Sequence, residues 1–77
     1  MKLSIIEAKK VIRMYLILHG PSTSLEIRDG LGREVTGQFP KYIHDIIRGM
    51  GQLTRERQEG SRKYRYYVRG YHVRYEE

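Results

Sequence analysis

The sequence lacks cysteine altogether, which excludes a disulfide framework and thiolate metal ligands. Its three histidines, His19, His44 and His72, lie far apart and show none of the short spacings that are typical of zinc ligands. Repeats and low-complexity linkers are also missing from the 77 residues, a length that suits one small domain spanning residues 1–77. We therefore expect one domain that holds no metal and no cofactor.

Long apolar runs are missing as well, since no stretch approaches the ~20 residues that a membrane-spanning helix requires. Near the N-terminus, Glu7, Lys9 and Lys10 interrupt the apolar residues, so this segment does not have the pattern of a signal peptide. The sequence thus predicts a soluble, cytoplasmic protein without a membrane partner.

The residue patterns of common catalytic sites are also missing. The acidic residues are not paired in an apolar pocket pattern, the serines have no nearby histidine, and Gly30-x-Gly32 lacks the rest of a phosphate-binding loop. A core of this size leaves little room for a buried ligand cavity of ~300 Å³ or more. We expect neither an enzyme nor a small-molecule ligand.

What the chain does have is positive charge. Its 15 basic and 9 acidic residues give a formal net charge of +6, which suggests a polyanionic partner. The charge is concentrated near the C-terminus, where five basic residues and no acid lie between Ser61 and Arg74: Arg62, Lys63, Arg65, Arg69 and Arg74. Five of the seven tyrosines also follow residue 63.

A first helix is predicted over residues 4–19. Ser4 and Glu7 have the spacing of a capping box, and a core-facing stripe follows: Ile5, Ala8, Ile12, Tyr15, Leu16 and His19. A second apolar set, Val11, Met14 and Leu18, is turned away from that stripe. Either the fold wraps this helix on several sides, or the second set binds another copy of the chain in a homodimer.

A short second helix is predicted over residues 23–31. Gly20-Pro21 ends the first helix, and Thr23 with Glu26 forms a second possible capping box. We expect Gly30 and Gly32 to break this helix.

A third helix is predicted over residues 36–50, with Thr36 as its N-cap and Pro40 in its first turn, where a missing N–H is harmless. Its spacing predicts one buried stripe, formed by Phe39, Ile43, Ile46, Ile47 and Met50. The opposite side carries Gln38, Lys41, His44, Asp45 and Arg48. Such side chains suit the reading of base edges in a major groove, although a solvated face is the simpler interpretation of one helix considered alone.

A β-hairpin is predicted over residues 52–69, where two β-prone runs flank Gln58-Glu59-Gly60-Ser61. In the second run, Tyr64 and Tyr66 alternate with basic residues, so we expect one buried face and one basic face. The residues at the tip and flanks that carry its charge are Arg55, Arg57, Arg62, Lys63 and Arg65. The tail, residues 70–77, shows a weak strand pattern at Tyr71, Val73 and Tyr75.

Taken together, residues 22–32, the segment Thr36–Gly51 and the basic hairpin resemble a winged helix-turn-helix DNA-binding domain. The features that carry the resemblance are the Leu31-Gly32 turn and the Gly51-Gln52-Leu53 step into the hairpin. It implies an α+β fold of three helices followed by a two-stranded β-hairpin wing. Within this family the chain is similar to the small stand-alone regulators of archaea, their viruses and plasmids.

The resemblance implies that the third helix lies in the major groove and that the wing follows the backbone. Its groove candidates are Gln38, Lys41, Tyr42, His44, Asp45 and Arg48, and its backbone candidates are Arg55, Arg57, Arg62, Lys63 and Arg65. Tyr42 lies at the edge of the apolar stripe and is expected more in the core than in the groove, and Asp45 would repel phosphate unless it accepts from cytosine or orients a cation. Gly37 and Pro40 depart from the family pattern.

The resulting interpretation is a sequence-specific, double-stranded DNA-binding transcription regulator, homodimeric and nucleoid-associated. Two alternatives stay open: a protein–protein interaction module that uses the apolar first helix and the tyrosine-rich tail, and a non-specific protein that coats nucleic acid.

Overall fold

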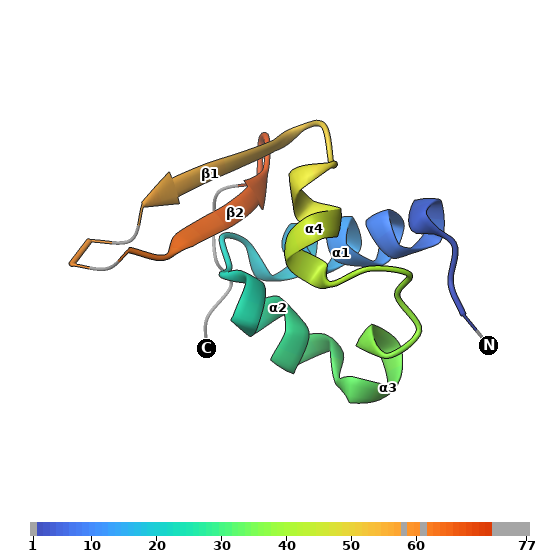
Figure 1. Ribbon diagram of the computed structural model, residues 1–77. Helices are drawn as coiled ribbons and strands as arrows, with labels where there is room; N and C mark the ends of the chain where they lie inside the picture. The colour runs from blue at the N-terminus through green and yellow to red at the C-terminus, as the bar shows by residue number, and fades with distance from the viewer. Residues whose placement is uncertain (1, 58, 61, 72–77) are drawn as a thin grey trace.

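The computed structural model describes residues 2–57, 59–60 and 62–71. This part of the chain forms four helices, α1 (Ile5–His19), α2 (Ser24–Leu31), α3 (Arg33–Thr36) and α4 (Ile43–Arg48), followed by the antiparallel strands β1 (Leu53–Arg57) and β2 (Tyr64–Val68) (Figure 1). The predicted α+β class is confirmed, and the layout is compatible with a winged-helix arrangement. The expectation of three helices is wrong, because the described residues form four.

Both predicted capping boxes are present. The Ser4 hydroxyl accepts from the Glu7 backbone N–H at 3.1 Å, while the Ser4 N–H donates to the Glu7 carboxylate at 3.0 Å. Thr23 and Glu26 make the same two bonds at 3.1 and 2.9 Å. These bonds satisfy N–H groups that a helix start leaves free, so α1 and α2 begin directly after Ser4 and Thr23.

The predicted helix over residues 36–50 is wrong in its first half. Thr36 is not an N-cap but the last residue of α3, where its hydroxyl donates to the Gly32 carbonyl at 3.1 Å. Pro40 lies in the link between α3 and α4, because a proline disfavours helical geometry in the residue before it and cannot donate to the preceding turn. Helix α4 therefore begins only at Ile43, with Tyr42 as its N-cap in extended geometry (ψ 146°).

Gly30 does not break α2, contrary to expectation, but lies within it. A Cβ atom at this position would lie 2.3 Å from the Tyr15 hydroxyl, so any other residue here would require the Tyr15 side chain to move. That hydroxyl donates to the Glu26 carbonyl at 3.2 Å and so links α1 to α2. Gly32 is the residue at which α2 ends.

The core lies where α1 packs against α2, α4 and β2. The predicted stripe from Phe39 to Met50 is buried throughout, although Phe39 and Met50 lie outside α4. On α1, Ala8, Ile12 and Leu16 are buried, whereas His19 is exposed and its ring stacks on Tyr15 with centroids 4.2 Å apart. Among the described residues, the buried apolar ones are Ala8, Ile12, Leu16, Ile27, Phe39, Ile43, Ile46, Ile47, Met50 and Val68.

The hairpin projects beyond the helices and is attached to them at its base (Figure 1). Its register pairs Leu53 with Val68 at the base and Arg57 with Tyr64 toward the tip. Ser22, which is fully buried, pairs with Tyr66 through two backbone hydrogen bonds of 3.0 and 2.8 Å. The segment between α1 and α2 therefore holds the outer edge of β2.

Among the described residues, no helix combines the length and the apolar character that crossing a membrane would require. The strand signal expected in the tail falls largely on residues 72–77, which lie outside the described part of the chain.

Candidate functional site

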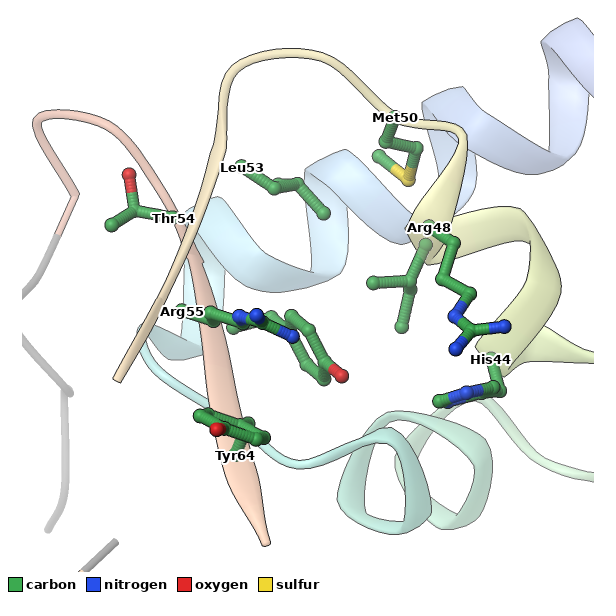
Figure 2. Close-up of a pocket in the computed structure, with 9 residues that line it drawn as sticks. His44, Arg48, Met50, Leu53, Thr54, Arg55 and Tyr64 are labelled. Carbon is green, nitrogen blue, oxygen red and sulfur yellow. The ribbon is translucent and has the colours of Figure 1, made fainter. Parts of the chain in front are cut away.

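Three hollows on the surface meet at His44, the second residue of α4. The first, with a volume of 460 Å³, lies between α4 and the hairpin and is lined by His44, Ile47, Arg48, Met50, Leu53, Thr54, Arg55, Tyr64 and Tyr66 (Figure 2). The second, of 200 Å³, lies between α2 and the hairpin and is lined by Thr23, Ser24, Leu25, His44, Arg62, Lys63, Tyr64 and Tyr66. The third, of 150 Å³, lies between α2 and the start of α4 and is lined by Ser24, Leu25, Arg28, Tyr42, Ile43 and His44. We call this surface the His44 face.

The charge of the His44 face has one sign. Among the residues described, its lining includes five cations and no carboxylate, the cations being Arg28, Arg48, Arg55, Arg62 and Lys63. Figure 2 shows His44 and Arg48 on one side of the first hollow and Arg55 and Tyr64 on the other. Low-dielectric walls lined by one sign of charge concentrate the electrostatic potential, so the face favours an anionic ligand.

No group of three or more His, Asp or Glu side chains in the described ranges is placed to hold a metal ion.

The hairpin wall of this face combines arginine with tyrosine. Because directly paired residues point to the same side of an antiparallel sheet, Arg55 and Arg57 share a face with Tyr64 and Tyr66. The Arg55 guanidinium lies over the Tyr64 ring, 4.5 Å from its centroid, and that of Arg57 lies 6.0 Å away. The arginines of the first strand therefore lie beside the tyrosines, so the basic residues of the hairpin do not all share one face.

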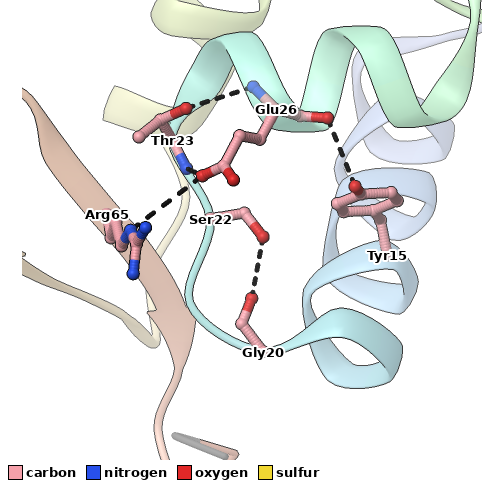
Figure 3. Close-up of polar contacts among 6 residues, drawn as sticks. All are labelled: Tyr15, Gly20, Ser22, Thr23, Glu26 and Arg65. Atoms are coloured by element: carbon pink, nitrogen blue, oxygen red, sulfur yellow. Dashed lines mark hydrogen bonds and ion pairs between the residues drawn. The ribbon is translucent and has the colours of Figure 1, made fainter. Parts of the chain in front are cut away.

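Arg65 lies on the other side of the hairpin and points toward α2. Its Nε is 4.0 Å from the Glu26 carboxylate, which also accepts from the Thr23 backbone N–H (Figure 3). The Arg65 side chain is only 30% exposed. Arg65, which was predicted to contact the DNA backbone, thus lies against α2 and helps to join the hairpin to it.

The predicted helix-face residues are only partly brought together. His44, Asp45 and Arg48 are exposed on α4, and Lys41 is exposed just before it. Gln38 lies apart, because its side-chain amide donates to the Glu34 carbonyl of α3 at 3.0 Å. Within the described structure Asp45 forms no ion pair with Lys41 or Arg48, so it does not orient either cation.

Tyr42 was expected more in the core than on the surface, and this is wrong: the residue is 84% exposed. The helical period predicts the direction of a side chain only within a continuous helix. Tyr42 lies ahead of α4 in extended geometry, so the period does not apply to it. It reaches the His44 face together with Leu25, which is 41% exposed and was not predicted as a site residue. Arg28, also missed, lines the same hollow and lies 3.5 Å from the Asp29 carboxylate.

The predicted dimerisation residues lie on α1, away from this face. Met14 and Leu18 are 55% and 61% exposed, whereas Val11 is partly buried against the core. Ile6, which was missed, is 65% exposed and extends the same side of the helix. We call Ile6, Met14 and Leu18 the α1 outer stripe.

Comparison of the chain with protein-family models, with curated proteins and with solved structures gives no match.

Proposed function

We propose that the protein is a sequence-specific, double-stranded DNA-binding transcription regulator of the winged-helix type. The observation that carries this proposal is the His44 face, on which cations from α2, α4 and the hairpin line three joined hollows, with no carboxylate among the described lining residues. Arginine and lysine are the usual partners of phosphate and of guanine. In this arrangement α4 lies in the major groove and the hairpin lies along the flanking backbone.

The shortness of α4 favours a dimer. Six helical residues extend over roughly 9 Å at about 1.5 Å per residue, the rise of about three base pairs. One subunit would read too few bases to define a site, whereas two subunits read two half-sites. Half-sites about one helical turn apart are expected for such a symmetric regulator.

The α1 outer stripe is suited to hold that dimer. Ile6 and Leu18 lie at equal distances along the helix from residue 12, and so do Lys10 and Met14. In an antiparallel α1 pair with a two-fold axis level with residue 12, the Lys10 methylenes would cover Met14 of the partner subunit, and Ile6 and Leu18 would lie toward the two ends of the interface. A self-complementary patch of this kind is what a two-fold interface requires.

The direct test is fluorescence anisotropy with random-sequence duplex DNA at two salt concentrations, followed by selection of bound sequences. We expect affinity to fall steeply with salt, because each neutralised phosphate contributes a slope of about −0.9 in log K against log salt. The selected pool should contain two related half-sites.

Two outcomes would contradict the proposal in different ways. Salt-sensitive binding without an enriched sequence would indicate a non-specific architectural protein. No binding at low salt would exclude the nucleic-acid role and leave a protein interaction module.

A further inference from the structure

Tyr42 and Leu25 form a small apolar area at the edge of a basic face. Tyr42 is 84% exposed and Leu25 41% exposed, and both line the 150 Å³ hollow between α2 and α4. The other side chains of that hollow include His44 and Arg28, and Lys41 immediately precedes Tyr42 and is exposed. The apolar area is therefore surrounded by groups that favour an anionic partner.

This position restricts what could cover the two side chains. The hollow shares His44 with the 460 Å³ hollow beside the hairpin, so a ligand that fills the larger one extends toward Tyr42. Arg28, Arg48 and Arg55 disfavour a second copy of this basic chain at the same place. If the ligand is duplex DNA, the apolar group that a major groove presents at base edges is the C5-methyl group of thymine.

We propose that Tyr42 and Leu25 determine sequence specificity by packing on the C5-methyl group of thymine at one position in each half-site. This inference rests on the proposed DNA-binding function and specifies part of the sequence that it reads. The Tyr42 ring supplies flat apolar area, and Leu25 supplies a branched side chain beside it. Hydrogen bonds from Arg48 to bases and from the hairpin to phosphates contribute to affinity separately from this apolar contact.

The test replaces thymine by deoxyuridine, which removes only the methyl group. Each thymine of a selected site is replaced in turn, and affinity is measured by anisotropy for the wild type, Tyr42→Ala, Tyr42→Phe and Leu25→Ala. For the wild type we expect one thymine per half-site at which deoxyuridine weakens binding about fourfold, the equivalent of about 0.8 kcal/mol for one buried carbon group.

At that position the variants should differ in how much affinity they lose when deoxyuridine replaces thymine. Tyr42→Ala should bind thymine and deoxyuridine sites equally, Leu25→Ala should lose part of the difference, and Tyr42→Phe should keep all of it because the ring is retained. Tyr71→Ala serves as the matched control, since Tyr71 is also exposed but lines none of the three hollows.

Several results would overturn the inference while leaving DNA binding intact. These are selected sites without thymine, no position sensitive to deoxyuridine, and an equal methyl preference in the wild type and Tyr42→Ala. A Tyr42→Phe protein that binds the thymine site and the deoxyuridine site more weakly by the same factor would also overturn it, since the loss would then come from the hydroxyl group. Absence of any DNA binding would instead refute the proposed function.

Discussion

The His44 face and the α1 outer stripe differ in almost every property that governs binding. The first is a set of hollows lined by five cations, and the second consists of three exposed apolar side chains on one helix. A basic face repels its own copy, whereas an apolar stripe has no hydrogen-bond donors for phosphate. In the proposed function, the 77 residues would therefore present one side to DNA and another side to a second subunit.

The two regions also differ in how they depend on the rest of the fold. The α1 outer stripe lies on the back of a helix whose other side carries the buried Ala8, Ile12 and Leu16. The His44 face is assembled from three elements, so its geometry depends on how the hairpin is attached to α2. Substitutions in the stripe should therefore change association without changing the fold, whereas changes under the His44 face should alter both binding and stability.

The largest expected effect is on DNA affinity. Arg48→Ala should cost about 1–3 kcal/mol at one base position and little elsewhere, the range of a good base contact. Arg62→Ala should weaken binding to all sequences alike and reduce the salt slope by about 0.9. Arg33→Ala on α3 is the charge-matched control, because Arg33 is exposed and lines none of the three hollows, and it should leave affinity at low salt unchanged. Similar losses for all three variants would show that net charge, and not the His44 face, governs binding.

The next effect in size concerns association. Leu18→Glu and Met14→Glu should convert a dimer to a monomer in sedimentation equilibrium, because an apolar side chain contributes about 1.5–3 kcal/mol when it is fully buried and an ion would have to be desolvated. Circular dichroism should stay unchanged, since both positions are exposed. Arg33→Glu on α3, also exposed, is the control. A wild-type protein that is already monomeric would remove the role assigned to the stripe.

A smaller effect distinguishes the two capping boxes, one at the start of α1 and one at the start of α2. Glu26→Ala should cost about 1–2 kcal/mol of unfolding free energy, because it removes a capping bond and the partner of Arg65. Glu7→Ala should cost less, since its box is exposed and contacts no other element in the hydrogen bonds described. Chemical denaturation measures both. If the two variants were equally destabilised, the Glu26–Arg65 contact would have no role in holding the hairpin.

Features that depend on a few neighbouring residues were predictable from the sequence. Features that depend on where a helix begins, or on which residues of two strands pair, were not. The capping boxes involve residues three apart, and both were predicted correctly. The apolar spacing from Phe39 to Met50 predicted burial correctly even though helix α4 covers only part of it.

The features that were not predicted depend on a helix boundary, on the pairing of two strands and on a contact between two helices. Pro40 interrupts the predicted third helix, so the helical phase that placed Tyr42 near the core does not apply to it. Alternation along the second strand could not place Arg55, because its face depends on the register with Tyr66. The role of Gly30 was hidden because it depends on Tyr15, which lies on another helix.

The smallest effect should appear in the pH dependence of stability at the start of α1. The pKa of Glu7 is lowered, mainly because the Ser4 backbone N–H donates to its carboxylate. A folded-state pKa below the unfolded value means that this stabilisation is fully present above the unfolded pKa and is lost as pH falls through the folded one. The melting temperature of Glu7→Gln should therefore lie slightly below that of the wild type at neutral pH and approach it in acid.

Measured by circular dichroism at one fixed protein concentration, this convergence separates the cap from association, because a dimer's melting temperature depends on concentration. Arg33→Gln is a control at an exposed position outside the cap and should shift melting equally at both pH values. A Glu7→Gln difference that persists unchanged below the folded pKa would mean that the Glu7 charge does not stabilise α1.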